Sequence, residues 1–234
     1  MPIGAIFDLD GTLVAFKLDL RGARKEVIEE LARRGYDTSA LDASSYTQMI
    51  LDAANAQTPK GEERRFEEAR RAAFDILDRF ETAGVVGAQP LPGIRGALDH
   101  LRLSGVRMAV LTNSGRKAAS AELENAGIGA YFEFVLTRDE TVVMKPAPTG
   151  VAMAAARLGL GKDSTYYVGD SPYDVRAAKA AGVKAIAVAT GNYPVDRLRG
   201  EGADYAAVSV AQLKSFFDGL VKQKRDSPFR RPTG

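Results

Sequence analysis

Two aspartates, Asp8 and Asp10, stand one residue apart where an apolar stretch ends, in "AIFDLDGTLV" (residues 5–14). A third aspartate, Asp170, closes another apolar stretch, "TYYVGD" (residues 165–170). If these carboxylates converge, two charges about 4 Å apart repel by roughly 4 kcal/mol at an effective dielectric of ~20. Such a pocket needs a bound cation, unless one carboxyl holds a proton. Oxygen ligands with room for waters suit Mg2+ better than zinc, so the sequence predicts a magnesium site.

Groups that could hold an anion follow other apolar stretches. Thr112 ends "RMAVLT" (residues 107–112), and Asn113 opens the helix that follows. The free backbone N–H groups at a helix N-terminus, with the positive end of its dipole, attract anions. Lys145 adds a fixed positive charge, and Asp174 adds a carboxylate shortly after Asp170. Carboxylates, Mg2+, a lysine and a helix N-terminus together favour a site that moves a phosphoryl group.

The elements that must position these residues alternate along the C-terminal part of the chain. Short, β-branched apolar runs predict strands at 107–112, 132–137, 165–170, 184–189 and 204–209. Alanine-rich stretches, most of them closed by glycine, predict helices at 93–105, 115–127, 148–159 and 171–182, with one more after the last strand. Continuous apolar strands that alternate with helices are typical of a parallel sheet covered on both faces. We therefore predict an α/β, Rossmann-like fold whose first strand lies within residues 5–14.

No strand-like run occurs between residues 16 and 88, where helical periodicity dominates. The pattern predicts helices at 19–35 and 61–84 and a shorter one near 44–56, before a hinge rich in proline and glycine at 87–93. This organisation indicates a helical module inserted directly after the first strand. We predict a core formed by residues 1–15 and 89–221, a helical cap at 16–88, and a basic, disordered tail at 222–234.

Composition excludes several functional classes. The 234 residues carry a net charge of +2, but the predicted tail holds five basic residues and one acidic residue, which leaves −2 for the remainder. The body is therefore not a surface for nucleic acid. The tail could contact nucleic acid or acidic lipid, but a disordered, solubilising end is the preferred interpretation. There is no cysteine, which excludes disulfides and thiolate metal sites. Strand-like sequence begins at Ile3 and no apolar run approaches membrane-spanning length, so we expect a cytoplasmic protein without membrane association.

The motifs "FDLDGTL", "LTN", "KPAP" and "GDSPYD" resemble, in order and approximate spacing, those of the haloacid dehalogenase-like hydrolases. The arrangement is most similar to the phosphoglycolate phosphatase-like branch, in which a helical cap follows the first motif. The resemblance implies a Mg2+-dependent phosphatase acting on a small phosphate ester, with phosphoglycolate as the family-level guess. It leaves the substrate and the oligomeric state open. One departure is that Ala15, Phe16 and Lys17 stand where many relatives continue with an acidic residue.

The resemblance also implies roles for individual residues. Asp8 matches the nucleophile that forms an aspartyl-phosphate, and Asp10 matches the general acid/base. Alternate residues of an extended chain share a side, so this spacing can present both groups to one substrate. The remaining roles are metal binding by the Asp8 and Asp170 carboxylates and the Asp10 carbonyl, phosphate binding by Thr112, the Asn113 backbone and Lys145, and orientation of Lys145 or a metal-bound water by Asp174.

Structural alternatives exist for most of these positions. Asp10 could begin a turn, Thr112 and Asn113 could cap a helix, and Lys145 could be solvated. Asp170 could start a helix, with proline next but one, and Asp174 could be a surface residue. In the cap, the polar residues that could face either the substrate or solvent are Gln48, Lys60, Arg64 and Arg65.

Two other functions remain open. A sugar-phosphate mutase of the same family would use a cap histidine, but the single histidine, His100, lies outside residues 16–88. A non-enzymatic module on this fold is the second alternative.

Overall fold

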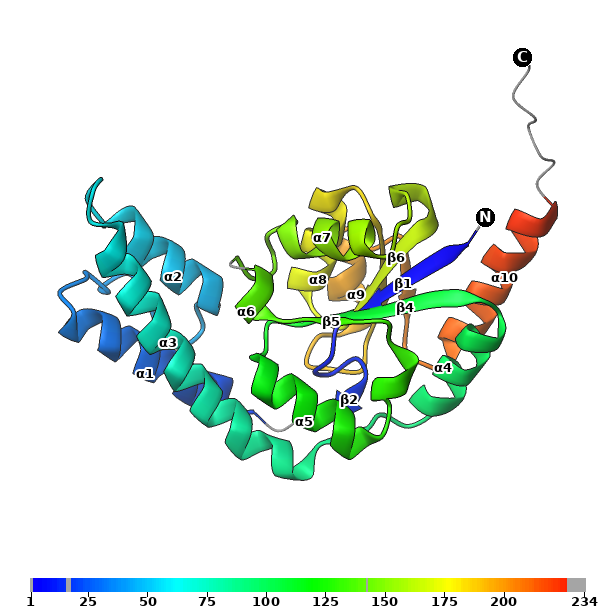
Figure 1. The fold of residues 1–234 in the computed structure, drawn as a ribbon, viewed down its shortest axis with the longest axis horizontal. Helices are drawn as coiled ribbons and strands as arrows, with labels where there is room; N and C mark the ends of the chain where they lie inside the picture. The colour runs from blue at the N-terminus through cyan, green and yellow to red at the C-terminus, as the bar shows by residue number, and fades with distance from the viewer. Residues whose placement is uncertain (1, 16–17, 142, 227–234) are drawn as a thin grey trace, which may run out of the picture.

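The computed structural model describes residues 2–15, 18–141 and 143–226 (Figure 1). Its main sheet has six parallel strands in the order β5-β4-β1-β6-β7-β8. The strands are β1 (Ile3–Phe7), β4 (Val106–Leu111), β5 (Val135–Leu136), β6 (Thr165–Gly169), β7 (Lys184–Val188) and β8 (Tyr205–Ala207). The first strand therefore lies at the centre, between β4 and β6, and the α/β fold predicted from the sequence is confirmed.

Helices cover both faces of this sheet because successive strand residues point to opposite sides. In β1, Phe7 packs in one apolar layer and Ile6 in the other. The first layer contains α4 (Ile94–Leu103), α5 (Arg116–Ala126) and α10 (Gln212–Asp226). The second contains α7 (Thr149–Arg157), α8 (Pro172–Ala181) and α9 (Val195–Gly200). A further short helix, α6 (Arg138–Thr141), follows β5.

The sequence sets the ends of α8 locally. Ser171 caps the helix because its side chain accepts a hydrogen bond from the Asp174 N–H, and the Asp174 carboxylate accepts one from the Ser171 N–H. Pro172 occupies the first helical position, where its missing N–H costs nothing. Gly182 ends the helix with a left-handed φ of 72°. The cap at Ser171 fixes where α8 begins after β6, and therefore fixes the positions of Asp170 and Asp174.

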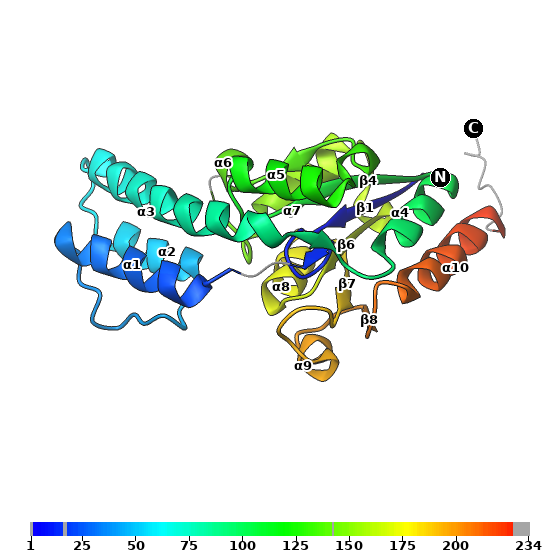
Figure 2. The ribbon, with the colours of Figure 1, turned by 90° about the horizontal axis from the view of Figure 1, so that it is seen from below.

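The inserted cap contains three helices beside the core (Figure 2). They are α1 (Leu20–Arg33), α2 (Thr47–Ala56) and α3 (Glu63–Gly84), and η1 (Val85–Gly87) follows α3. Their apolar stripes form a separate cluster that includes Val27, Leu51 and Ala73 and that also takes in Met144 from the core. Where the chain enters and leaves the cap, β2 (Val14–Ala15) and β3 (Gln89–Pro90) pair in an antiparallel ladder. Both connections therefore lie side by side.

The structure corrects several predicted boundaries. The strand predicted at 132–137 covers only Val135–Leu136, and α6, α9 and the β2–β3 pair were not predicted. Helix α10 continues to Asp226, so residues 222–226 are helical rather than disordered. The remaining tail, 227–234, lies outside the described residues. None of the described helices combines the length and apolarity needed to cross a membrane.

Candidate active site

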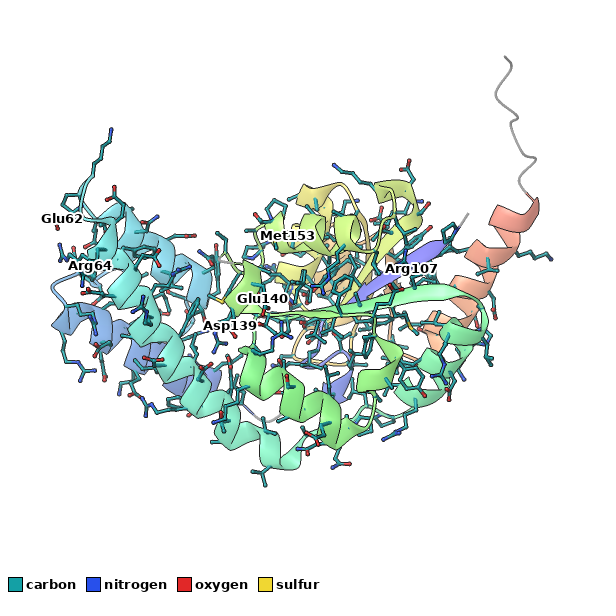
Figure 3. The ribbon with its side chains drawn as sticks, in the orientation of Figure 1. Glu62, Arg64, Arg107, Asp139, Glu140 and Met153 are labelled. Atoms are coloured by element: carbon teal, nitrogen blue, oxygen red, sulfur yellow. The ribbon has the colours of Figure 1, made fainter. Side chains whose placement is uncertain are left out.

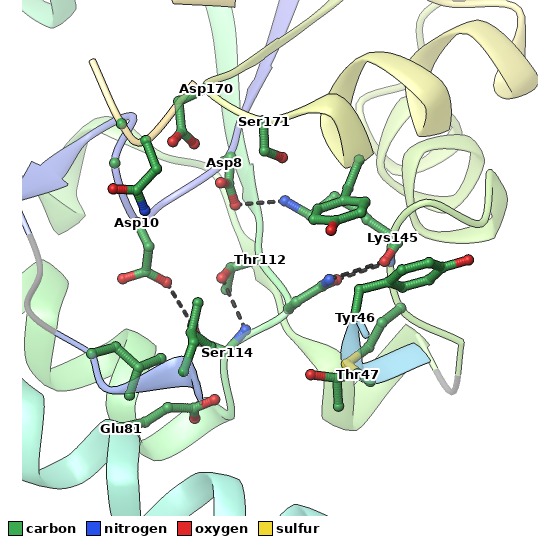
Figure 4. Close-up of a pocket in the computed structure, with 18 of the residues that line it drawn as sticks. Asp8, Asp10, Tyr46, Thr47, Glu81, Thr112, Ser114, Lys145, Asp170 and Ser171 are labelled. Atoms are coloured by element: carbon green, nitrogen blue, oxygen red, sulfur yellow. Dashed lines mark hydrogen bonds and ion pairs between the residues drawn. The ribbon is translucent and has the colours of Figure 1, made fainter. Parts of the chain in front are cut away.

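Three neighbouring strands end at the same edge of the sheet, and a polar residue follows each of them. Asp8 follows β1, Thr112 follows β4 and Asp170 follows β6 (Figure 4). With Asp174 from α8, Asp8 and Asp170 form a buried cluster in which one carboxylate oxygen of each lies within 4.8 Å of the others. Ligands of open parallel sheets bind at this edge. The fold therefore brings together carboxylates that are far apart in the sequence.

Lys145 is the cation of this cluster. Its Nζ donates hydrogen bonds to Asp8 Oδ1 at 2.6 Å, to Asp174 Oδ1 at 2.7 Å and to the Tyr167 hydroxyl at 2.9 Å. Burial by itself would lower the pKa of Lys145, but the charges of Asp174 and Asp8 outweigh it and hold that pKa well above its usual value. Lys145 is therefore a charged ammonium group in a fixed position.

Both oxygens of Asp174 have partners within the protein. Oδ1 accepts from Lys145, and Oδ2 accepts from the Ser171 N–H at 3.0 Å and from the Ser171 hydroxyl at 2.5 Å. The carboxylate that caps α8 thus also orients Lys145. This geometry favours the positioning role, rather than direct metal binding, that the family resemblance implies for Asp174.

Asp170 is enclosed by two glycines. A Cβ atom at Gly11, which has a left-handed φ of 76°, would lie 2.5 Å from Asp170 Oδ2. A Cβ atom at Gly191 would lie only 1.6 Å from the same oxygen. The Thr12 hydroxyl donates to Asp170 Oδ1 at 3.3 Å. The position of this carboxylate therefore depends on bare backbone on two sides.

The charges of the cluster fit a divalent cation. Burial first, and then the Asp174 charge, raises the pKa of Asp8 well above its usual value and that of Asp170 to about 7. If ionised, three carboxylates face one ammonium group, which leaves a net charge of −2. Oxygen-only donors that leave room for waters match the preferences of Mg2+. The residues present therefore fit the magnesium site predicted from the sequence.

Asp10 turns toward the start of α5 rather than toward Lys145 (Figure 4). Its Oδ2 accepts a hydrogen bond from the Ser114 hydroxyl at 2.6 Å. Burial raises the pKa of Asp10, and the hydrogen bonds from Ser114 and Glu122 oppose that rise. A buried carboxyl that can hold a proton and is tied down at one oxygen is suited to proton transfer.

Glu122, on α5, is a buried neighbour of Asp10 that sequence reasoning missed. Its side chain is fully buried, and no N–H group or alcohol of a described residue reaches either of its oxygens or Asp10 Oδ1. Burial, the Asp10 charge and a hydrogen bond to Asp10 raise the pKa of Glu122 to about 10. Glu122 is therefore protonated at neutral pH and donates to the Asp10 carboxyl group. The surrounding sequence, "AELENAG", is typical of a solvent-exposed helix and does not indicate that Glu122 is buried.

The loop between β4 and α5 holds the lysine from the other side. The Asn113 side chain accepts from the Lys145 N–H at 2.9 Å and donates to the Lys145 carbonyl at 3.1 Å. Thr112 Oγ1 accepts from the Ser114 N–H at 3.0 Å, which leaves the Thr112 hydroxyl proton available to another acceptor. From the sequence, only the backbone of Asn113 was assigned a role. The contact of its side chain with Lys145 was missed because the two residues are distant in the chain.

The expectation that the N-terminus of α5 offers free N–H groups is wrong for the N-cap residue, Gly115, and for the first helical residue, Arg116. The Gly115 N–H donates to Glu81 Oε2 at 3.0 Å, and the Arg116 N–H donates to Asp139 Oδ2 at 2.7 Å. Carboxylates of the chain itself therefore bind these donors. Helix N-termini attract such carboxylates for the same reason that they attract phosphate.

A buried arginine joins the cap to the core. The Arg138 side chain is fully buried, and its Nη1 donates to Glu81 Oε1 at 2.5 Å and to the Asn113 carbonyl at 3.0 Å. Arg138 also forms an ion pair with Asp78, which lies one turn before Glu81 on α3. Burial raises the pKa of Glu81 and the Arg138 charge opposes that rise. This pair fixes the end of α3 beside the active-site loop.

The cap also contacts the core above the carboxylates. Gln48, on α2, accepts a hydrogen bond from the Met144 N–H at 2.8 Å. The Tyr46 ring lies 5.1 Å from the Tyr173 ring of the core, measured between centroids. Together with α1, these residues roof a cavity of about 530 Å3 whose floor contains Asp8.

The polar cap residues singled out from the sequence lie in different environments. Gln48 lines the cavity, whereas Lys60 and Arg64 face solvent, Arg64 at the far end of the cap (Figure 3). Arg65 packs over the Tyr36 ring at 4.7 Å. Arg24, which lines the cavity, was missed. Its position shortly after the first motif was the signal that could have pointed to it.

Residues 5–188 match the family model for haloacid dehalogenase-like hydrolases. Among the relatives is a phosphoglycolate phosphatase from Pseudomonas fluorescens, 31% identical over 95% of this chain and 81% of that protein. Another, from Rhodospirillum rubrum, is 33% identical over 82% of this chain and 81% of that protein.

Solved structures share the fold. The crystal structure of a hydrolase from Pseudomonas syringae superimposes with a TM-score of 0.65. It is 20% identical in sequence and covers 94% of this chain and 99% of its own. The cap and core described above are thus similar in arrangement to an experimentally determined structure.

Proposed function

The chain belongs to the haloacid dehalogenase-like hydrolases, and we propose that it is a Mg2+-dependent phosphatase that hydrolyses a small phosphomonoester through an aspartyl-phosphate. The observation that carries this proposal is the buried Asp8 carboxylate, held by Lys145 at 2.6 Å beneath the roofed cavity. An anionic nucleophile beside a fixed cation is the arrangement that phosphoryl transfer needs, since the phosphate must be held while it is attacked.

In the first step, an Asp8 oxygen attacks phosphorus, and the bond between phosphorus and the ester oxygen breaks. Asp10 gives its proton to the departing alkoxide, which leaves as an alcohol. The raised pKa of Asp10 supports this role because the group must carry a proton when the reaction begins. Lys145 and the Thr112 hydroxyl hold the phosphate oxygens during this step.

In the second step, Asp10, now ionised, takes a proton from water. The resulting hydroxide attacks phosphorus, the bond between phosphorus and Asp8 breaks, and inorganic phosphate leaves. Asp8 returns as a carboxylate and Asp10 as the acid, so the cycle is closed. The hydrogen bond from Ser114 keeps Asp10 in one orientation through both steps.

The groups that would hold Mg2+ are the Asp8 and Asp170 carboxylates and the Asp10 backbone carbonyl. The ion supplies positive charge that offsets the charges of the carboxylates and of the phosphate. Asp174 orients Lys145 from behind. The cap excludes bulk water from the cavity and contacts the leaving group.

Phosphoglycolate is the first substrate to test, because the relatives reported above are named for it. The direct test measures phosphate release from a panel of phosphate esters with Mg2+, with a chelator, and with Asp8→Asn. We expect turnover only for the unmodified enzyme with Mg2+. Turnover retained by Asp8→Asn, or in the presence of chelator, would contradict the mechanism.

A mutase function has less support. His100 bonds to Asp218 at 2.6 Å, in a contact between α4 and α10, and is not among the residues that line the cavity. The proton-carrying cap histidine of the mutases has no counterpart in residues 16–88. Conversion of a hexose 1-phosphate to its isomer without release of phosphate would restore this alternative.

A further inference from the structure

The charged side chains that line the cavity are divided between its floor and its roof. The floor contains the carboxylates of Asp8, Asp10 and Asp170 together with Lys145, and Glu81, which is paired with Arg138, lines the cavity from the end of α3. The roof contributes Arg21 and Arg24 from α1. A phosphate and Mg2+ account for the charges of the floor. They leave the roof arginines without a function.

Arg24 is half-buried and has no counter-charge. Its Nε is buried without a hydrogen-bond partner, and none of the ion pairs found among the described residues includes Arg24. The Nε of Arg138 is unpaired in the same way, but the buried cations Lys145 and Arg138 are, in contrast to Arg24, each bonded to two carboxylates. Arg24 is therefore a cavity-lining cation that forms no ion pair with any described residue.

Arg24 lines the cavity from the cap, whereas Asp8 and Asp170 line it from the core. The hydroxyl of Tyr193, another residue that lines the cavity, is affected by charges from both sides. Burial, and after it the neighbouring Tyr173, raises the pKa of Tyr193, while smaller contributions come from the Arg24 charge, which acts to lower it, and the Asp170 charge, which acts to raise it. Tyr193 therefore lies within the fields of both the roof guanidinium and the floor carboxylate.

We propose that Arg24 binds a second anionic group of the substrate, on the leaving-group side of the ester. A guanidinium group fits a carboxylate or a second phosphate, and either would supply the counter-charge that no ion pair among the described residues gives to Arg24. Arg24 is then a specificity-determining residue, because an ester with a neutral leaving group leaves it unpaired. The inference rests on the phosphatase function proposed above and assigns one part of that site.

The test compares esters that differ only in this second group. The carboxylate ester is 2-phosphoglycolate, the ester with a second phosphate is ethylene glycol bisphosphate, and the neutral ester is 2-hydroxyethyl phosphate. The full-length variants are Arg24→Gln, which removes the charge, and Arg24→Lys, which keeps it. Arg64→Gln is the matched control, because the Arg64 side chain is 92% exposed at the far end of the cap.

We expect Arg24→Gln to lower kcat/KM for one or both anionic esters by about 10- to 100-fold, the range for a lost charge-assisted hydrogen bond. The value for the neutral ester should change by less than about 3-fold, Arg24→Lys should recover part of the loss, and Arg64→Gln should have no effect. The larger loss identifies the anionic group that Arg24 binds. Equal losses for charged and neutral esters, or none, would overturn the proposal, because displacement of the cap affects all esters alike.

Failure of the phosphatase function gives a different result. In that case the unmodified protein turns over none of the three esters. Calorimetric titration with 2-phosphoglycolate then decides the question for Arg24 on its own. A Kd raised about 10-fold by Arg24→Gln and unchanged by Arg64→Gln supports the assignment, whereas absence of binding or an equal Kd refutes it.

Discussion

Replacement of Glu122 by glutamine should make the protein more stable at neutral and alkaline pH. Glu122 is fully buried beside Asp10, and its pKa is raised to about 10 from an ordinary value of 4.5. Glutamine has nearly the same shape, and its NH2 group can donate the hydrogen bond that protonated Glu122 gives to Asp10. The substitution therefore removes a proton that titrates without removing the contact.

The sign and size of the effect follow from proton linkage. Between pH 4.5 and about 10 the folded protein holds the Glu122 proton and the unfolded chain does not. A group with a raised folded pKa contributes stability that is complete below its unfolded pKa and is lost as pH rises toward the folded value. The free energy of unfolding should therefore fall by up to ~1.4 kcal/mol per pH unit on account of Glu122. From about pH 5.5 to about pH 8.5, this amounts to ~4 kcal/mol.

The assay is urea unfolding of both proteins across this pH range, with chelator present. The chain has no tryptophan and eight tyrosines, so far-ultraviolet circular dichroism and tyrosine fluorescence are the signals. Titrating groups that both proteins share cancel in the difference between their free energies of unfolding. That difference should grow with pH in favour of Glu122→Gln.

The control is Glu124→Gln, on the same helix but facing solvent, which should show no such growth. A difference between Glu122→Gln and the unmodified protein that stays constant from about pH 5.5 to about pH 8.5 would refute the reasoning. It would mean that Glu122 is ionised in the folded protein, and that Asp10 lacks a donor on this side.

Two further substitutions test how the site is held. Gly191→Ala places a Cβ atom that would lie 1.6 Å from Asp170 Oδ2, so we expect the Mg2+ concentration for half-maximal activity to rise at least ~10-fold. Gly200→Ala, where nothing lies within 4 Å, is its control, and equal Mg2+ dependence in both would contradict the proposed ligand. Arg138→Met leaves Glu81 buried without its cation and should lower the free energy of unfolding by ~3–5 kcal/mol in urea titrations. Adding Glu81→Gln should restore part of that loss, and a double variant no more stable than Arg138→Met would argue against the pair.

The sequence predicted the parts of the site that depend on local pattern. Asp8 and Asp170 each follow an apolar strand, and strands of a parallel sheet end at a common edge, so their convergence needed only the fold class. The cap helices were predicted for a similar reason, since their apolar stripes have helical spacing. In both cases, each pattern that allowed the prediction lies within one short segment of the chain.

The interactions that the sequence did not reveal join distant segments. Glu122 has the composition of an exposed helical residue, and only the packing of α5 against the first loop buries it next to Asp10. Asn113 positions Lys145 from another segment, and Arg138 pairs with Glu81 across the boundary between core and cap. No periodicity records such pairings, because each depends on where whole elements dock.

The buried carboxyl groups differ in what their burial supports. Asp8 and Asp170 are costly to ionise in the folded protein, yet the proposed cation and phosphate would use their charges directly. Glu122 is also costly to ionise in the folded protein, but it lies behind Asp10 and does not line the cavity. A residue that only lowered stability would be replaceable without consequence for activity. Glu122→Leu cannot donate to Asp10, whereas Glu122→Gln can. A comparison of their activities therefore tests whether the stability lost by burying Glu122 supports proton transfer by Asp10.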